Sequence, residues 1–475
     1  SFTADIDYQA LELYLKFMSV PAPHSIYKNI YKVEPGCLVS VKLDRSVNHF
    51  KYWDHAKNIQ LSATNKYQNT YQETKLQLER MLTRTVGDQM VADVTVGAFL
   101  SGGIDSSLIV ALMQKHSSKK VKTYSISFDD ERYDEASYGE SVANYIGTDH
   151  KVQKVTAEHL LNIVPKLPYI YDEPFSDSSQ IPTFLISQLT RQKVTVSLSG
   201  DGGDELFGGY NRHFWGQNLW EKISWLPPQS RRILAQIISS ISPLTWNTIY
   251  KILGPILPVK LQQPDFGNKV HKLAKVLGAT NEDTVYLKLI SLWDVSSNLV
   301  RNTTHIKDFS VKYHSWPSIK GFTQRMMFLD AMTYLPDDIL VKVDRASMAV
   351  SLETRAPFLN HRLVEFAWKT PISMKVRNGQ GKWLLRQVLY KYIPKKLIER
   401  PKAGFAVPIS AWLRGPLRDW AEDLLDEKVL KQDGFFNPNP IRDKWKEHLS
   451  GKKNWHHHLW AVLMFQSWLQ SQKKG

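Results

Sequence analysis

Residues 94–116 read VTVGAFLSGGIDSSLIVALMQKH, an order that predicts a strand, a glycine loop and a helix in succession. The first part, 94–100, is an apolar run of strand length that is rich in β-branched residues. The loop 101–107 interrupts this run, and apolar residues then recur at the spacing of a helix. The segment therefore predicts a βα unit whose loop follows the carboxyl end of a strand.

This loop has the chemistry of a phosphate site. Its two glycines let backbone N–H groups approach a ligand, and the following helix directs its positive N-terminal end at the same place. Asp105 would repel a bare phosphate, so its presence indicates a bridging Mg²⁺ ion, which takes oxygen ligands. An ordinary serine–glycine turn is the alternative, but a complete SGGIDSS between a strand and a helix favours phosphate. The chain contains no GxxxxGK(S/T) sequence, which excludes a Walker A loop.

A second loop, 199–210, reads SGDGGDELFGGY and follows another predicted strand, 194–199. Three carboxylates and five glycines directly after a strand make a poor packing element. The ligand spacing of an EF-hand is absent, and a solvated acidic loop is the remaining alternative. Because both loops follow strands of one predicted sheet, we expect Asp105 and Asp204 to share Mg²⁺.

Strands and helices alternate over residues 71–199, which predicts an α/β fold with a doubly wound, mostly parallel sheet. Residues 26–53 predict small strands around a turn, and 56–69 a polar linker. Residues 206–334 predict a helical insertion that packs on itself, with an amphipathic membrane-surface helix as the alternative. The C-terminal region is also expected to be helical. The other expected strands are 121–128 and 150–155, and the expected helices are 7–17, 71–91, 135–146, 157–167 and 181–191.

Composition limits the number of domains, the kinds of cysteine site and the location of the protein. The chain has 475 residues, of which 43% are hydrophobic and 23% charged, as in soluble globular proteins of two or three domains. Cys37 is the only cysteine, which excludes a disulfide framework and a paired-cysteine metal or sulfur-transfer site. Prolines and polar residues interrupt the most apolar long region, 232–259, so we expect no membrane span. With no signal peptide expected, the sequence favours a cytoplasmic protein.

The net charge of +15 comes from 61 basic and 46 acidic residues and raises the question of a nucleic-acid partner. The lysines are spread along the chain rather than gathered in one run, and no RRM, helix-turn-helix or zinc-finger pattern accompanies them. Solvated lysines and a phosphate-rich substrate explain the charge more simply. We therefore expect no nucleic-acid partner.

Five motifs carry a resemblance to known enzymes. They are LSGGIDSS at 100–107, DEP at 172–174, LSGDGGDELFGGY at 198–210, VDRASMAVSLETRAPFLN at 343–360 and GKWLLR at 381–386. The first resembles the pyrophosphate loop of the N-type ATP pyrophosphatases. Together, and in this order, the five resemble the synthetase domain of glutamine-dependent asparagine synthetase. The resemblance covers nearly the whole chain and implies an ATP-pyrophosphatase type of sheet.

The resemblance implies a reaction. ATP adenylates a carboxylate, with the aspartate side chain favoured, and pyrophosphate leaves; ammonia then attacks the acyl-adenylate to give the amide and AMP. One alternative is an amidotransferase or cyclase that acts on a sugar-acid or peptide carboxylate. Another is a catalytically silent nucleotide-binding protein, against which the joint presence of Asp105, Asp204 and Lys382 argues.

The resemblance also implies roles for single residues. It places Mg²⁺ on Asp105 and Asp204, and it matches Lys382 to the family lysine that stabilises the transition state. Asp201 is the second residue to which the resemblance gives a catalytic role. It stands beside the acceptor site, at a position where the family carries glutamate. Lys402 is a weaker candidate than Lys382 for a lysine of the site. An ion-pair network or substrate contact is expected of Asp344, Arg345, Glu353 and Arg355. ATP is expected on Phe99, Leu100, Ser101, Gly102, Gly103, Asp105, Ser106, Ser107, Ile126, Ser199 and Gly200.

The same resemblance suggests four parts of the chain. Residues 1–55 resemble the end of a glutaminase domain, and the expected synthetase parts are a core at 56–205, an insertion at 206–334 and a C-terminal part at 335–475. The family's glutaminase uses an N-terminal cysteine, whereas this chain starts with Ser1, and Cys37 is expected to be an ordinary buried cysteine. We therefore expect most of the glutaminase domain to be missing and ammonia to come from such a domain, a separate chain or solution. A homodimer is left open.

Overall fold

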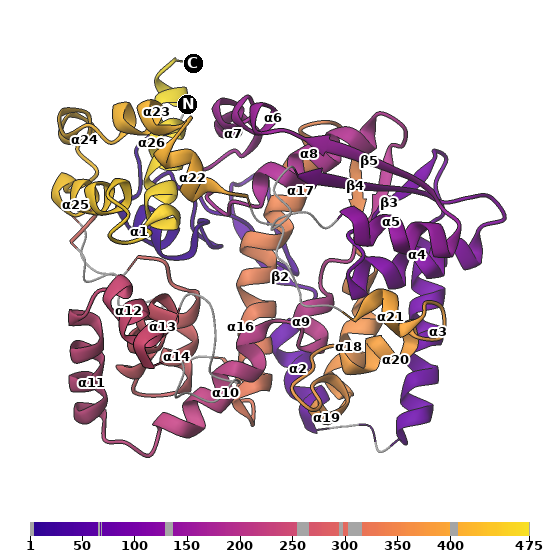
Figure 1. The fold of residues 1–475 in the computed structure, drawn as a ribbon. Coiled ribbons are helices and arrows are strands. Elements are labelled where there is room, and N and C mark those ends of the chain that lie inside the picture. The colour runs from indigo at the N-terminus through magenta and orange to yellow at the C-terminus, as the bar shows by residue number, and fades with distance from the viewer. Residues whose placement is uncertain are drawn as a thin grey trace.

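A five-stranded parallel sheet lies at the centre of the region that carries the predicted motifs (Figure 1). The computed structural model describes residues 4–64, 67, 69–128, 136–253, 266–293, 298–302, 316–399 and 407–474. The strand order is β5-β4-β3-β6-β7, which confirms the predicted α/β fold with a parallel sheet. The strands are β3 (Val96–Phe99), β4 (Lys122–Phe128), β5 (Asp149–Val155), β6 (Val196–Leu198) and β7 (Glu353–Arg355).

The register of the sheet brings the two predicted loops together. Ala98 of β3 pairs with Thr123 of β4 on one side and with Leu198 of β6 on the other. The chain segments that leave β3 and β6 therefore emerge side by side at one edge. Strand β7 was not predicted, because its three residues are too few to show an alternating pattern.

Helices cover both faces of the sheet, as a doubly wound fold requires. On one face the side chains of β4, among them Ile126, pack in a cluster with α8 (Gln180–Arg191). On the other, Ala98 joins a second cluster with α3 (Tyr71–Gln89) and α4 (Ile104–His116). Helix α5 (Ala136–Ile146) contacts β4 and β5.

Two expectations about local structure are wrong. Residues 56–69 are not only a linker, because α2 (His55–Thr64) lies there, buries Ile59 and packs on α18 (His361–Lys369). Its mixed composition gives a weak amphipathic signal. The single helix expected at 157–167 is divided into α6 (Ala157–Leu161), a 3₁₀ turn η1 (Val164–Lys166) and α7 (Leu167–Ile170). Pro165 and Pro168 each begin a new turn, since proline lacks the N–H that would continue a helix.

The N-terminal segment forms a helix and a hairpin. Asp7 caps α1 (Tyr8–Phe17), and the Tyr14 hydroxyl donates to the Ala461 carbonyl at 2.7 Å, so α1 is tied to the C-terminal helix. The hairpin of β1 (Cys37–Val41) and β2 (Val47–Lys51) is antiparallel, and none of its ten residues is buried. Cys37 is only half-buried, so the expectation of a buried cysteine is wrong.

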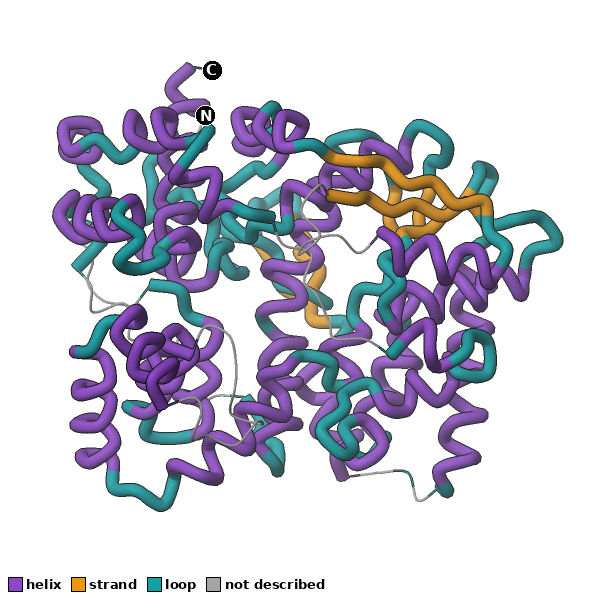
Figure 2. Tube along the Cα trace, viewed as in Figure 1, coloured by secondary structure: helices purple, strands orange, loops and turns teal. Residues whose placement is uncertain are grey.

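The described parts of 203–332 contain helices and connecting loops, in agreement with the expected helical insertion (Figure 2). They are α9 (Gly203–Phe207), α10 (Asn211–Ile223), α11 (Pro228–Ser240), α12 (Pro243–Leu253), α13 (Phe266–Leu277), α14 (Glu282–Ile290) and α16 (Phe322–Met332). Within the described ranges, no helix combines the length and apolar character needed to span a bilayer.

The C-terminal part is helical apart from β7, as expected. It starts with a π-helical turn η5 (Leu335–Ile339) that continues into α17 (Leu340–Met348), followed by η6 (Pro357–Leu359) and α18. The last helix, α26 (His456–Lys474), buries Trp460 and Trp468 beside Trp445 of α25 (Pro438–Leu449). The other helices are α19 (Ile372–Lys375), α20 (Trp383–Leu389), α21 (Lys395–Ile398), α22 (Ile409–Arg414), α23 (Arg418–Leu424) and α24 (Glu427–Asp433).

Candidate active site

The predicted phosphate loop lies between β3 and the N-terminus of α4. Gly103 is the N-cap residue of α4, and no side chain caps this end of the helix. The Ser101 and Ser106 hydroxyls lie 3.1 Å apart, and the Gly103 N–H donates to Ser101 Oγ at 3.3 Å. These hydrogen bonds hold the loop in shape. The free N–H groups in the first turn of α4 form the positive end of the helix and point to the sheet edge.

A cavity of about 680 Å³ lies at this edge, within the size range of small-molecule sites. Two of the fourteen predicted residues do not line it. Ser107 is fully buried, and Gly102 lies against the backbone of Tyr138, where a Cβ atom would come within 2.7 Å. The predicted residues that line the cavity are Phe99, Leu100, Ser101, Gly103, Asp105, Ser106, Ile126, Ser199, Gly200, Asp201, Asp204 and Lys382.

Three charged groups meet in the cavity. The ammonium of Lys382 lies 2.7 Å from Asp204 Oδ1 and also contacts Asp105 Oδ2. Asp105 comes from the first turn of α4, Asp204 from α9 after β6, and Lys382 from the residue before α20. The expected convergence of the two carboxylates is therefore present, and a lysine ammonium lies between them.

Two glycines allow this close approach. A Cβ atom on Gly203 would lie 2.5 Å from Asp105 Oδ1, and one on Gly209 would collide with Asp204 and Lys382. A larger residue at position 203 would displace Asp105 of the first loop, and one at position 209 would displace Asp204 and Lys382. The glycines of the 199–210 loop thus have a packing role, because they bring the two carboxylates within reach of one cation.

The position of Lys382 is fixed by its backbone. Its φ of +57° lies in the left-handed region, and its N–H donates to the Phe207 carbonyl at 2.9 Å. Burial alone would lower the pKa of Lys382, but Asp105 and Asp204 outweigh it and raise the pKa. Lys382 is therefore a permanent cation at neutral pH.

The donor set suits Mg²⁺. Asp105 and Asp204 converge on one cation from different loops, and their side chains keep 16% and 20% of their exposure towards the cavity. Across the described ranges, no cluster of three or more His, Cys, Asp or Glu side chains could hold a metal. Mg²⁺ commonly takes one or two carboxylates together with substrate phosphates. These two residues could therefore hold the ion once a nucleotide adds its oxygens.

A second lysine lines the cavity from α17. Lys342 Nζ lies 2.6 Å from Asp177 Oδ2 and 3.7 Å from Asp338 Oδ1. Burial lowers its pKa, but Asp177 and Asp338 outweigh this effect and raise the pKa, so Lys342 stays charged. Asp201 also lines the cavity, and burial raises the pKa of its carboxyl. Sequence reasoning missed Lys342, although its spacing of four residues from Asp338 is a recognisable helical ion pair.

Glu205 and Tyr210 form another part of the wall that sequence reasoning did not single out. The Tyr210 hydroxyl donates to Glu205 Oε1 at 2.6 Å, and the Arg212 guanidinium stacks over the Tyr210 ring at 4.0 Å. Arg212 is in turn held by Asp330 at 2.9 Å. Burial, followed by the charge of Asp204, raises the pKa of Glu205 to about 7.

The remaining motif residues have structural contacts. Glu173 of the DEP motif accepts a hydrogen bond from the Ile26 N–H at 2.9 Å and pairs with Lys32 at 2.9 Å. Asp172 pairs with Arg345 at 2.5 Å. The DEP motif therefore joins the N-terminal segment to α17.

The other expected ion-pair residues also contact protein groups. Arg345 pairs with Asp344 as well, and Arg355 pairs with Glu353 at 2.6 Å. Arg355 further donates to the Gln89 carbonyl at 2.7 Å. Lys402 lies outside the described residues.

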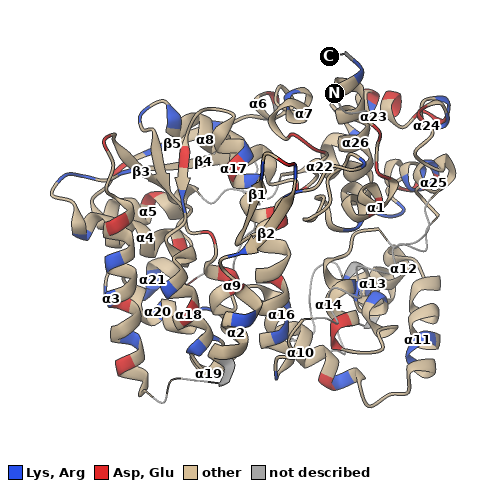
Figure 3. Ribbon diagram, turned by 180° about the vertical axis from the view of Figure 1, so that it is seen from behind, with Lys and Arg blue, Asp and Glu red and all other residues tan. Residues whose placement is uncertain are grey.

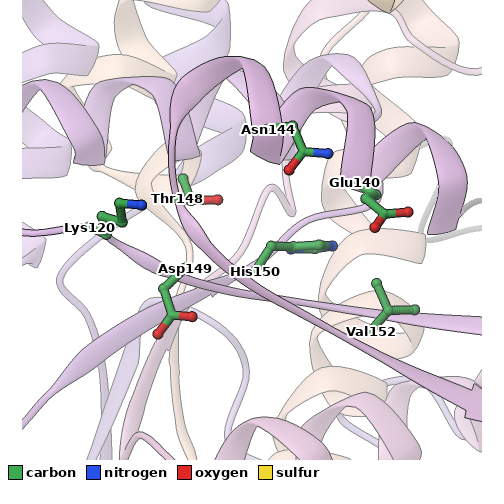
Figure 4. Close-up of a pocket in the computed structure, with 7 residues that line it drawn as sticks. All are labelled: Lys120, Glu140, Asn144, Thr148, Asp149, His150 and Val152. Atoms are coloured by element: carbon green, nitrogen blue, oxygen red, sulfur yellow. The ribbon is translucent and has the colours of Figure 1, made fainter.

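A second cavity, of about 550 Å³, lies at the amino ends of β4 and β5 (Figure 4). It is lined by Lys120, Glu140, Asn144, Thr148, Asp149, His150 and Val152. The His150 ring is held through Nδ1 by the Thr123 hydroxyl at 2.8 Å. None of the predicted site residues lines this cavity, and it lies at the edge of the sheet opposite the phosphate loop.

Comparison with known proteins agrees with the motif resemblance. The family model for asparagine synthase matches residues 77–470. The chain is 29% identical over 467 residues to glutamine-hydrolyzing asparagine synthetase 1 of Bacillus subtilis, covering 98% of this chain and 69% of that protein. It is 30% identical over 473 residues to a putative glutamine-hydrolyzing asparagine synthetase of Mycobacterium tuberculosis, covering 98% and 68%. Amidase chry2 of Gibberella zeae is 24% identical over 451 residues, covering 88% and 64%.

Proposed function

The chain belongs to the asparagine synthase family, and we propose that it activates a carboxylate with ATP as an acyl-adenylate and converts it to an amide with ammonia. The observation that carries the proposal is the meeting of Asp105, Asp204 and Lys382 at the ends of β3 and β6. In open α/β sheets, ligands bind beyond the carboxyl ends of the strands. A catalytically silent protein would have no need to bury three charges in this arrangement.

The N–H groups of α4 and the loop before it would receive the phosphates of ATP. Mg²⁺ held by Asp105 and Asp204 would offset charge on the leaving pyrophosphate. Lys382 is the permanent cation beside these carboxylates, so it would stabilise the negative charge that develops as the phosphate is attacked. Phe99, Ile126, Ser199 and Gly200 would hold the adenosine, as the resemblance implies.

The acceptor carboxylate would enter along the wall formed by Asp201 and Lys342. Aspartate is the first candidate, because relatives that match 98% of this chain carry the name asparagine synthetase. A different carboxylate, such as a sugar acid, is the second candidate. Asp201 favours it, because its side chain is one methylene shorter than the glutamate of the family and would place its carboxyl further from the acceptor.

Ammonia is the proposed nitrogen donor, supplied by a glutamine-hydrolysing unit. The β1–β2 hairpin offers a docking surface for such a unit, since it exposes Leu38, Val41, Val47 and Phe50. An isolated two-stranded hairpin is only marginally stable in water, so a covering partner would stabilise it. The proposed cytoplasmic location and a homodimer remain predictions.

The test is pyrophosphate release by the purified chain with ATP, Mg²⁺, ammonium and one carboxylate at a time. The panel contains aspartate, succinate and glucuronate, and Asp204→Asn is the matched inactive variant. We expect one carboxylate to stimulate pyrophosphate release at least tenfold and to yield its amide. If no carboxylate stimulates release above the level of Asp204→Asn, the proposed reaction is wrong.

A further inference from the structure

Helix α11 carries apolar side chains on two different sides. Ala235 and Ile238 are half-buried and pack against the second hydrophobic cluster, which extends from the sheet into the insertion. Ile233 and Ile237, one helical turn apart, are 57% and 54% exposed, and Leu234 beside them is exposed too. The inward side accounts for the folding of the helix onto α13, so the outward side is free for another contact.

Neighbouring elements also carry exposed apolar side chains. Trp225, in the turn before α11, is 75% exposed, and its indole N–H donates to the Lys222 carbonyl at 2.7 Å. On α12, Leu244 and Ile252 are also exposed. Figure 1 shows α11 at the outer edge of the molecule, away from the sheet. We call Trp225, Ile233, Leu234, Ile237, Leu244 and Ile252 the insertion surface.

The same region has a net positive charge because it is poor in acidic residues. Residues 222–280 contain eight Lys or Arg residues and one acidic residue, so they supply close to half of the net charge of +15. The excess comes from the scarcity of acidic residues, because basic residues are about as frequent here as in the whole chain. Figure 3 shows basic residues on α11 and α13 in this part of the molecule. The exposed cations are Lys222, Arg232, Lys251, Lys269 and Lys272.

We propose that the insertion surface binds peripherally to an anionic membrane. Exposed Trp, Ile and Leu side chains flanked by Lys and Arg are the features with which helices lie in the headgroup region of a bilayer. Anionic lipids attract the cations, and the apolar side chains enter the boundary of the acyl chains. A nucleic acid would satisfy the cations but would leave the aliphatic side chains in water. This proposal does not depend on the reaction of the active site.

The experiment is flotation of the chain with vesicles made of equal parts of phosphatidylcholine and phosphatidylglycerol. Vesicles of phosphatidylcholine alone are the comparison. We expect the chain to float with the mixed vesicles, to bind phosphatidylcholine at least tenfold more weakly, and to be released by high salt. Absence of binding to the mixed vesicles, or equal binding to both kinds, would overturn the proposal.

Two variants identify the surface. Ile233→Ser combined with Ile237→Ser should lower vesicle binding at least fivefold, and both positions are exposed, so the fold should persist. Val41→Ser with Val47→Ser on the hairpin is the matched control and should bind like the unmodified chain. Equal binding by both variants would contradict the assignment. The assignment would also be contradicted if the unmodified chain were a dimer and the Ile233/Ile237 variant a monomer. The insertion surface would then be a contact between two copies of the protein.

Discussion

Replacing Lys382 by Met tests the central arrangement of the site, because it removes the ammonium and keeps the apolar stem. Asp105 and Asp204 would then face each other without their shared cation. Removing one partner of a buried ion pair costs about 3–5 kcal/mol. Both carboxylates keep some exposure, so we expect the lower end, about 3 kcal/mol. For a chain of 475 residues the entropy of unfolding is about 1 kcal/mol per kelvin, so the melting temperature should fall by about 3 °C.

Thermal unfolding without nucleotide, with and without MgCl₂, is the assay for this variant. In Lys382→Met the two carboxylates are open to Mg²⁺, so the ion should restore much of the lost melting temperature. In the unmodified chain Lys382 already lies between them, and Mg²⁺ alone should change the melting temperature much less.

Lys431→Met is the control for this measurement. Its ammonium pairs with Glu427 at 2.6 Å, both side chains are more than half exposed, and such surface pairs contribute about 0–1 kcal/mol. An unchanged melting temperature in Lys382→Met, together with no response to Mg²⁺, would refute the convergence of Asp105 and Asp204 on one cation. Equal losses in both variants would refute the special role of Lys382.

Three further predictions follow from the site and the C-terminal helices. Gly203→Ala should reduce carboxylate-dependent pyrophosphate release at least a hundredfold, because the new Cβ would lie 2.5 Å from Asp105 Oδ1; near-normal release would contradict the packing argument. Lys342→Met should raise the KM for the acceptor more than the KM for ATP, and steady-state kinetics that show the reverse would move Lys342 to the nucleotide side. Burial lowers the pKa of His448 to about 4 and of His458 to about 3. Below pH 6.5 these histidines therefore bind protons in the unfolded chain but stay neutral in the folded chain. The melting temperature should therefore fall from pH 7 to pH 4, and it should fall less steeply in His458→Asn. Parallel curves for the two proteins would count against a neutral His458 in the folded chain.

The sequence predicted the sheet and its two loops because they depend on local patterns. An apolar run followed by glycines marks both strand ends, and the alternation of strands and helices then requires the loops to lie at one edge. The register of β3 with β6 satisfies this requirement. Lys382 could be matched only through its flanking motif, because nothing in a single lysine indicates that it contacts Asp105 across the fold.

The features that the sequence did not predict depend on long-range packing. Strand β7 has three residues and is a strand only because β6 pairs with it. Helix α2 has little amphipathic character and is held by packing on α18. Lys342 reaches the cavity only because α17 packs against α8. The exposure of the insertion surface also requires the tertiary structure, since its apolar residues have the same pattern as those of a buried helix.

Transfer of an oxygen label tests the proposed acyl-adenylate most directly. The acceptor identified by pyrophosphate release would carry oxygen-18 in its carboxylate, and the products with ATP, Mg²⁺ and ammonium would be analysed by mass spectrometry. Attack of the carboxylate on the α-phosphate, followed by amide formation, leaves one labelled oxygen in AMP and none in pyrophosphate. The account predicts this labelled AMP. Label in inorganic phosphate, with ADP as the other product, would show an acyl-phosphate instead and would contradict it.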